Sequence, residues 1–308
     1  MKFEKVAVLG AGTIGMSWAA LFAASGREVA VYDPAEGVEQ RVRAMVASTA
    51  DTLRELGWDK AGDTSRISFF TDPAEAVAGA DFIQENVPER LEIKHDTYAR
   101  IEPALAPGAI IGSSTSGLRL SEMQKGFADP SRFVLTHPFN PPHLIPLVEL
   151  MGNEATAEGV LAETQAFYES LGKVCVFLNK EVPGHIANRL QVAIWREAIN
   201  LAVEGVASVG DIDKAVAYGP GLRWAAMGPT TLFHLGGGAG GIRGFCDHLA
   251  GPVQSWWNDL GRPDLTPEVI DTLAKGVDEA VHGETLDQLA AERDKLILGY
   301  LKTRAALD

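Results

Sequence analysis

The stretch that decides the fold reads Val6-Ala7-Val8-Leu9-Gly10-Ala11-Gly12-Thr13-Ile14-Gly15. An apolar run followed by Gly-x-Gly-x-x-Gly and an amphipathic segment predicts a strand, a tight turn and a helix. Gly10 permits the turn, Gly12 lets the backbone approach a phosphate, and Gly15 allows close packing of the helix on the strand. We therefore predict a dinucleotide-binding βαβ unit, with the pyrophosphate at the helix N-terminus around Thr13 and Ile14.

A second apolar run ends in an acidic residue at the position that such a unit uses for the adenosine ribose. Val29-Ala30-Val31-Tyr32 is followed by Asp33, and an acidic residue roughly 20 positions after the first glycine holds the ribose 2′-hydroxyl. A carboxylate there repels the 2′-phosphate of NADP. The nearest arginines, Arg41 and Arg43, lie well into the next helical segment. The sequence therefore predicts NAD rather than NADP as the cofactor.

Short apolar runs alternate with longer helical patterns over the first 180 residues or so. Strands are predicted over residues 5–9, 28–32, 67–70, 81–85, 109–113, 133–136, 146–151 and 174–178. Amphipathic helices are predicted between them, for example over 15–25, 38–56 and 155–171. This alternation predicts an α/β fold, a Rossmann-type doubly wound sheet that is mostly parallel.

The pattern changes after Glu181-Val182-Pro183-Gly184. Segments 186–206, 211–217, 266–281 and 284–306 have the period of helices, and no convincing strand follows. We predict two domains, an NAD-binding Rossmann domain over residues 1–181 and an all-helical domain over 182–308. The glycine-rich run 236–241 follows no strand, so we interpret it as a tight loop between helices.

The charge balance and the cysteine content exclude several classes of partner. The 308 residues include 41 acidic and 27 basic side chains, a net charge of −14, which repels phosphate backbones and acidic membranes. Two cysteines, Cys175 and Cys246, are too few for a disulfide framework and suit a reducing cytoplasm. Neither an export signal nor an apolar run of about 18 residues is evident. We expect a cytoplasmic protein without nucleic-acid or membrane partners.

Side chains that could do chemistry gather in segments 112–116, 136–142 and 148–150, at or after predicted strands. Ligands of doubly wound sheets bind outside the carboxyl ends of the strands. Oxidation of an alcohol by hydride transfer needs a base for the hydroxyl proton, and His137 is the natural candidate. Glu149 lies within an apolar run, where a carboxylate is costly unless paired, so we predict a His137–Glu149 pair that holds one imidazole tautomer.

Less specific interpretations of these residues stay open. His137 could be a turn histidine, and Glu149 could form a structural salt bridge. A metal site at His137 and His143 is disfavoured, because prolines separate them and further ligands are lacking.

In combination, the motifs resemble those of the L-3-hydroxyacyl-CoA dehydrogenase family over nearly the whole chain. They are the glycine-rich start, Ser114-Thr115-Ser116, His137-Pro138-Phe139-Asn140-Pro141-Pro142, Pro146-Leu147-Val148-Glu149 and the segment 180–190. The resemblance implies that His137 is the general base and Glu149 its partner, and that Ser116 and Asn188 hydrogen-bond the substrate oxygen. It further implies that Glu89 and Lys94 contact the nicotinamide half of the cofactor, and that the protein forms a homodimer through its helical domain.

Each implied role has a simpler alternative. Ser116 could be a helix N-cap, Asn188 a polar surface residue, and Glu89 and Lys94 a solvated charge pair on a helix.

Two features favour the branch of the family that contains L-carnitine dehydrogenase and the lambda-crystallin-like L-gulonate 3-dehydrogenases. The connection 51–65 is short and acidic, where relatives that use CoA have a longer, lysine-rich helical hairpin. Arg223 and Trp224 are inserted shortly before Met227-Gly228-Pro229, where relatives that use CoA run more directly from glycine into Met-Gly-Pro. We hypothesise that Arg223 pairs with a free substrate carboxylate, which a guanidinium can grip with two hydrogen bonds. A salt bridge at the surface or in a dimer is the alternative.

The tryptophans Trp195, Trp224, Trp256 and Trp257 could offer ring faces to a quaternary ammonium, or could be core and interface residues. The predicted function is therefore NAD-dependent oxidation of the 3-hydroxyl of a small free L-3-hydroxy acid, carnitine-like or gulonate-like, to the 3-keto acid. The alternatives are an L-3-hydroxyacyl-CoA dehydrogenase and a non-catalytic, crystallin-like dinucleotide-binding protein.

Overall fold

The computed structural model describes residues 3–307, which form two compact units. The first unit extends to Arg189 and also includes the segment from Leu296, and the second unit comprises Leu190–Lys295. All strands belong to the first unit, whereas the second consists of helices and their connections. This confirms the predicted fold class, a Rossmann-type sheet followed by a helical C-terminal region.

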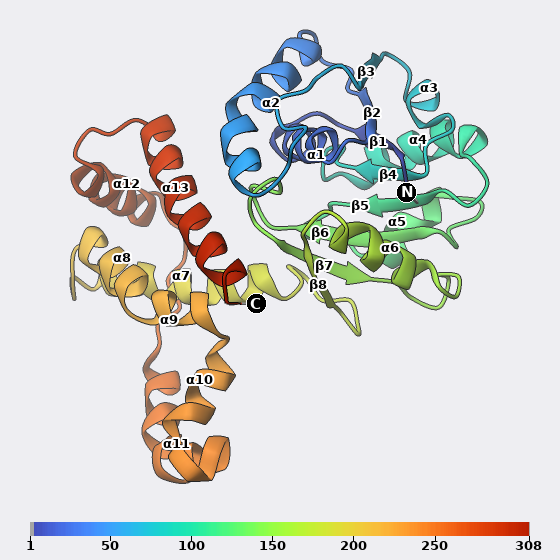
Figure 1. Ribbon diagram of the computed structural model, residues 1–308. Helices are drawn as coiled ribbons and strands as arrows, with labels where there is room; N and C mark the ends of the chain where they lie inside the picture. The colour runs from blue at the N-terminus through green and yellow to red at the C-terminus, as the bar shows by residue number, and fades with distance from the viewer. Residues whose placement is uncertain (1–2, 308) are drawn as a thin grey trace. The chain divides into compact units, whose positions relative to one another are not determined.

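One eight-stranded sheet forms the centre of the first unit, with the order β3-β2-β1-β4-β5-β6-β7-β8 (Figure 1). All neighbouring strands are parallel except β6 and β7, which pair antiparallel. All eight predicted strands are confirmed, each with ends within two residues of the prediction. The strands are β1 (Lys5–Leu9), β2 (Glu28–Tyr32), β3 (Ile67–Phe70), β4 (Phe82–Glu85), β5 (Ile110–Ser113), β6 (Phe133–Pro138), β7 (Leu147–Met151) and β8 (Val174–Phe177).

Helices α1 to α6 belong to the first unit, and α7 starts there and continues into the second. They are α1 (Thr13–Ala24), α2 (Val38–Glu55), α3 (Pro73–Val77), α4 (Leu91–Ile101), α5 (Leu120–Met123), α6 (Val160–Glu169) and α7 (Ala187–Val203). The helices that follow are α8 (Val209–Tyr218), α9 (Pro220–Ala226), α10 (Pro229–Gly236), α11 (Gly241–Asp259), α12 (Pro267–Val281) and α13 (Leu286–Ala305). None of the described helices is long and apolar enough to cross a membrane.

The region 218–260 is more helical than its sequence pattern indicated. α9 and α10 start with Pro220 and Pro229, and α11 contains Pro252, so the helical period is interrupted at each of them. The glycine-rich run is confirmed as a tight connection, because α10 ends at Gly236 and α11 begins at Gly241. A single 3-10 turn, Gly238–Gly240, lies between them.

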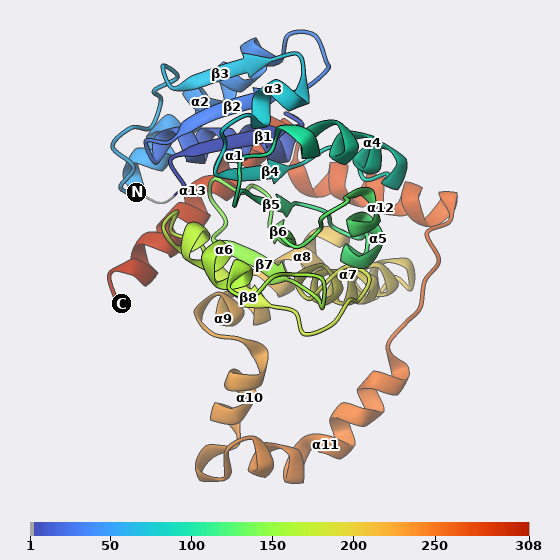
Figure 2. The same ribbon diagram turned by 90° about the vertical axis from the view of Figure 1, so that its right-hand side faces the viewer.

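Helices cover both faces of the sheet (Figures 1 and 2). Residues of α1, α2 and α6 pack in one buried cluster, and residues of α3, α4 and α5 pack in a second one. β1 contributes to both, because Val6 and Val8 belong to the first cluster and Ala7 and Leu9 to the second. Side chains of a strand alternate between the two faces, so a central parallel strand is apolar at every position. This explains why the uninterrupted apolar run Val6–Leu9 predicts a central parallel strand.

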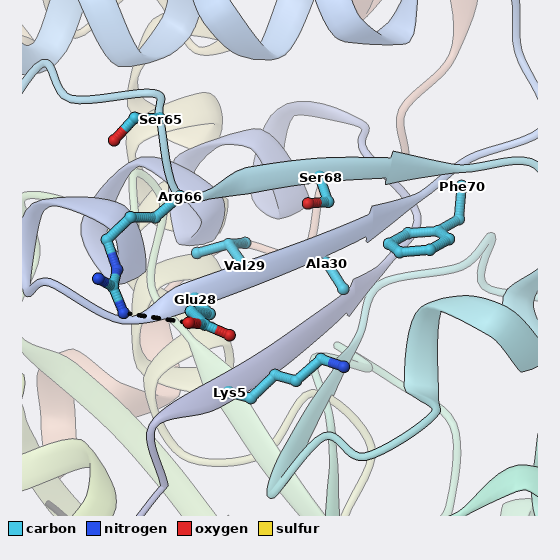
Figure 3. A pocket seen from close by; sticks show the side chains of 8 residues that line it. All are labelled: Lys5, Glu28, Val29, Ala30, Ser65, Arg66, Ser68 and Phe70. Carbon is cyan, nitrogen blue, oxygen red and sulfur yellow. Dashed lines mark hydrogen bonds and ion pairs between the residues drawn. The ribbon is translucent and has the colours of Figure 1, made fainter.

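A pocket of about 560 Å³ lies over β1, β2 and β3 (Figure 3). Lys5 and Glu28 begin their strands, and Ser65 and Arg66 precede β3, so most of the lining comes from the amino ends of the strands. Arg66 forms an ion pair with Glu28 across the pocket, at 3.4 Å. Ligands of doubly wound sheets bind at the opposite, carboxyl ends. This pocket is therefore distinct from the candidate active site.

Candidate active site

The glycine-rich turn follows β1 next to β4, where the strand order reverses direction. Gly10 has φ +85°, which favours glycine, and a Cβ there would lie 2.6 Å from the carbonyl oxygen of Asn86. A Cβ on Gly15 would lie 1.8 Å from the carbonyl oxygen of Gly10, so the first turn of α1 packs directly on the glycine turn. A Cβ on Gly12 would meet nothing within 4 Å. The backbone at Gly12 is thus open to a ligand at the N-terminus of α1, where Thr13 and Ile14 begin the helix.

Asp33 follows β2 and lies beside this turn. Its Oδ2 accepts a hydrogen bond from the backbone N–H of Ala11 at 2.7 Å, and its Oδ1 accepts one from Ala35 at 2.9 Å. The half-buried carboxylate keeps further lone pairs for a hydroxyl donor. An open glycine turn, a helix N-terminus and an adjacent acceptor fit the pyrophosphate and ribose of a dinucleotide.

A buried ionic network lies at the carboxyl ends of β4 and β5. Glu85 and Ser113 are paired in register, and the Ser113 hydroxyl donates to the Glu85 carboxylate at 2.6 Å. Lys94 is 1% exposed, and its Nζ lies 2.7 Å from Glu85 and 3.6 Å from Glu89. Lys94 is therefore not part of a solvated surface pair. Glu85 was not singled out from the sequence, although it is a carboxylate at the end of the predicted strand 81–85, which also holds the apolar Phe82 and Ile83.

Glu89 organises the turn that carries Ser116. Its Oε1 accepts hydrogen bonds from the Thr115 hydroxyl at 2.5 Å and from the backbone N–H groups of Ser116 and Gly117, each at 2.9 Å. Burial raises the pKa of Glu89, but these hydrogen bonds and Lys94 outweigh it, so the pKa is lowered. Glu89 is thus an ionised acceptor, and the side chain of Ser116 is exposed.

His137 and Glu149 form the centre of the site. The Nδ1 of His137 lies 2.7 Å from Oε2 of Glu149, and both residues are buried. Burial raises the pKa of Glu149, but hydrogen bonds from His137 and from two backbone N–H groups outweigh it, and the pKa is lowered. An ionised carboxylate accepts only, so Nδ1 of His137 carries the hydrogen and Nε2 has a free lone pair in the neutral ring. The imidazole is therefore held in the tautomer of a base at Nε2.

The start of α7 binds the other oxygen of Glu149. Its Oε1 accepts from the backbone N–H groups of Ile186 at 2.8 Å and Ala187 at 3.0 Å. The first N–H groups of a helix have no partner within the helix, and its N-terminus favours a negative charge. Asn188 follows Ala187 in the first turn and is half-buried. The contact with Glu149 therefore holds Asn188 near the His137–Glu149 pair.

His185 connects the parts of the site, and the sequence interpretation gave it no role. Its Nε2 lies 3.1 Å from the carbonyl oxygen of Thr115, next to Ser116. Its ring is tilted against that of His137, with 5.0 Å between the centroids. Contacts within the first unit therefore link the segments that carry Ser116, His137, Glu149 and Asn188.

Arg223 and Trp224 lie on α9 in the second unit, where Arg223 is exposed and Trp224 is half-buried. They are not among the side chains that gather around His137 within the first unit. Trp195, Trp256 and Trp257 are exposed, and they also belong to the second unit.

Comparison with known proteins agrees with the motifs. Residues 5–182 match the family model described as "3-hydroxyacyl-CoA dehydrogenase, NAD binding domain", and residues 184–275 match the C-terminal domain of the same family. An L-carnitine dehydrogenase of Streptomyces coelicolor is 46% identical over 99% of this chain and 96% of its own length. One from Nocardiopsis dassonvillei is 44% identical over 96% of this chain and 90% of its own length.

A solved structure extends the comparison to the fold. The 5-formyl-3-hydroxy-2-methylpyridine 4-carboxylic acid 5-dehydrogenase, described as an NAD+-dependent dismutase, superposes with a TM-score of 0.82. It is 32% identical and covers 98% of both chains. The resemblance seen in the motifs and the assignment of NAD as cofactor are confirmed. The chain belongs to the 3-hydroxyacyl-CoA dehydrogenase family of NAD-dependent oxidoreductases.

Proposed function

We propose that the protein oxidises the 3-hydroxyl of a small free L-3-hydroxy acid, L-carnitine or a close analogue, to the 3-keto acid with NAD. The observation that carries this proposal is the buried His137–Glu149 pair, in which Nδ1 of His137 contacts the carboxylate and Nε2 is left for a substrate. The relatives named L-carnitine dehydrogenase support the free acid as the substrate class. L-gulonate is the second free acid to test, because it also has a free carboxylate and a hydroxyl on its third carbon.

The chain's residues supply the proton chemistry. The substrate hydroxyl donates to Nε2 of His137, which takes its proton as the carbonyl forms. The imidazolium that results is stabilised by the ionised Glu149 at 2.7 Å. The Ser116 hydroxyl and the Asn188 amide donate to the substrate oxygen and hold it in place. Bound NAD supplies the hydride acceptor.

The cofactor is held by residues at the carboxyl ends of β1, β2 and β4. The backbone at Gly12 and the first turn of α1 would bind the pyrophosphate, and Asp33 would accept from the adenosine ribose. Gly10 and Gly15 permit the tight turn and the close helix packing that this site needs. Glu89 would contact the nicotinamide half, and its Oε2 lies 3.6 Å from Lys94 Nζ. Because Lys94 is almost fully buried, we propose that it positions Glu89 and favours its ionised form, without touching the cofactor itself.

We further propose Arg223 and Trp224, both on α9 of the second unit, as substrate-binding residues. A free hydroxy acid brings a carboxylate, and the exposed guanidinium of Arg223 can bind it with two hydrogen bonds. The ring of Trp224 can contact the rest of the substrate, including a quaternary ammonium.

The domain roles follow the predicted boundary. We propose that residues 1–181 bind NAD and that 182–308 contribute substrate contacts and the interface of a homodimer. Large exposed apolar side chains on the second unit, such as Trp256 at 65% and Trp257 at 64% exposure, support such an interface. Two free cysteines support a reducing, cytoplasmic location.

The test is NAD reduction with L-carnitine, L-gulonate, L-3-hydroxybutyrate and L-3-hydroxybutyryl-CoA at mildly alkaline pH. We expect one free acid to be turned over, and His137→Ala to lower kcat by about 10²–10⁴-fold. His248→Ala is the control, because His248 is an exposed histidine of the second unit. Preference for the CoA ester would overturn the free-acid proposal. NADH binding without turnover of any substrate would favour a non-catalytic role.

A further inference from the structure

His185 is a buried residue with an unused hydrogen-bonding atom. It is 3% exposed, and its Nδ1 has no hydrogen-bond partner among the described residues. Buried polar side-chain atoms are nearly always paired, because leaving one unpaired costs about 1–3 kcal/mol. An orphaned nitrogen on a ring that packs against the His137 imidazole therefore points to a ligand atom that pairs with it.

The tautomer of His185 identifies the kind of ligand atom. Its Nε2 lies 3.1 Å from the carbonyl oxygen of Thr115, which can only accept, so Nε2 carries the hydrogen. Burial, the largest influence, lowers the pKa of His185 and keeps the ring neutral. In a neutral ring that carries its hydrogen on Nε2, Nδ1 is an acceptor. The missing partner is therefore an N–H or O–H donor.

The backbone holds this side chain in an uncommon conformation. His185 has φ +52° and follows Gly184 at φ +74°, so two consecutive residues are left-handed just before Ile186 and the start of α7 at Ala187. A non-glycine residue rarely adopts this region, and such residues concentrate at functional sites. The same turn directs the N–H groups of Ile186 and Ala187 to Glu149. His185 is thus fixed on one side by Thr115 and on the other by the segment that binds the catalytic carboxylate.

We infer that Nδ1 of His185 accepts a hydrogen bond from the carboxamide N–H of the nicotinamide ring, which makes His185 a cofactor-orienting residue of this active site. This inference rests on the proposed function, because it takes the substrate to be a carnitine-like acid. A carnitine-like acid has a single hydroxyl, which donates to His137, and its carboxylate and quaternary ammonium carry no further donor. Hydride transfer requires the nicotinamide ring beside that hydroxyl, and the carboxamide is the ring's only N–H donor.

Two substitutions separate the acceptor from the structural contact. His185→Gln can keep the donor to the Thr115 carbonyl but places no atom at the position of Nδ1. His185→Asn places an acceptor close to the position of Nδ1 but loses the contact with Thr115. Thermal unfolding of both variants shows whether each one is folded. The matched comparison therefore distinguishes loss of the acceptor from loss of the Thr115 contact.

The measurement is binding of NADH, of ADP-ribose and of reduced 3-acetylpyridine adenine dinucleotide, whose acetyl group has no N–H. We expect His185→Gln to raise the Kd of NADH about tenfold or more, because a buried donor is left unpaired. The Kd values of the other two probes should stay within about twofold, and His185→Asn should bind NADH nearly as the parent protein does.

Three results would overturn the inference. They are an unchanged NADH affinity in His185→Gln, an equal loss for all three probes, and a loss in His185→Asn as large as in His185→Gln. The last would assign the effect to the Thr115 contact. Because the probes bind without turnover, the outcome does not depend on the identity of the hydroxy acid.

Discussion

His137 and Glu149 are directly opposite each other on the antiparallel strands β6 and β7, and their side chains lie on the same face of the sheet in hydrogen-bond contact. β6 and β7 are the only antiparallel neighbours in the described sheet. Directly paired residues of antiparallel strands have Cβ atoms about 5 Å apart, so an imidazole and a carboxylate at such positions can reach hydrogen-bond distance. The proposed catalytic pair thus depends on the one antiparallel pair of strands in the described sheet.

Glu149→Gln should lower kcat by about 10²–10⁴-fold while the protein stays folded. The amide oxygen can still accept from Ile186 and Ala187, but an amide nitrogen facing Nδ1 of His137 donates to it. The ring would then carry its hydrogen on Nε2, and His137 could not act as the proposed base. Steady-state kinetics with the substrate identified in the panel measure the effect. Glu122→Gln removes an exposed ion pair with Lys125 and should leave kcat unchanged.

Gly12→Ala and Gly15→Ala should affect different properties. A Cβ at Gly12 meets no protein atom within 4 Å, so Gly12→Ala should melt within about 2 °C of the parent but bind NADH at least tenfold more weakly. A Cβ at Gly15 would lie 1.8 Å from the carbonyl of Gly10, so Gly15→Ala should lower the melting temperature by several degrees. Equal NADH affinity of Gly12→Ala and the parent would contradict the proposed pyrophosphate site.

The stability of the protein should depend on pH through Lys173. Its buried Nζ donates to the carbonyl oxygens of Pro142 and Ile145, and burial lowers its pKa to about 7 from the usual 10.5. Between these values the unfolded chain binds one more proton than the folded protein, so the free energy of unfolding rises with pH through that window. Below pH 7 both states are protonated, and the full cost of burying the charge remains.

Denaturant unfolding of the parent and of Lys173→Met at pH 7 and pH 9 tests this prediction. The stability difference, parent minus variant, should increase by about 2–3 kcal/mol from pH 7 to pH 9. Parallel changes in the two proteins would show that Lys173 keeps its proton in the fold. Lys275→Met, which removes an exposed lysine of α12, is the control and should follow the parent.

Arg223→Ala should raise the KM for the free acid about tenfold or more and leave the Kd of NADH unchanged, because it removes the proposed bidentate partner of the carboxylate. Arg223→Lys should recover only part of the loss, since an ammonium cannot form the paired hydrogen bonds of a guanidinium. Arg243→Ala, on α11 of the same unit, is the matched control. An unchanged KM in Arg223→Ala would place the carboxylate partner elsewhere.

The sequence by itself determined the fold class, all eight strands and the cofactor, because each depends on local patterns. Continuous apolar runs such as Val6–Leu9 mark buried parallel strands, and the spacing of Gly10, Gly12 and Gly15 is set by one turn of backbone. The helices between 218 and 260 were less readable, because prolines and glycines interrupt the helical period there.

Only the tertiary structure decided how the site is assembled, because its contacts join segments that are far apart in the chain. The direct pairing of His137 with Glu149 depends on the antiparallel register of β6 and β7, which apolar patterns alone do not specify. The burial of Lys94 against Glu85 depends on how α4 packs on the sheet. The place of His185, between Thr115 and His137, depends on a left-handed turn and on a carbonyl 70 positions earlier in the chain. Periodicity encodes which face of an element is buried, and it does not encode which distant polar group that face will meet.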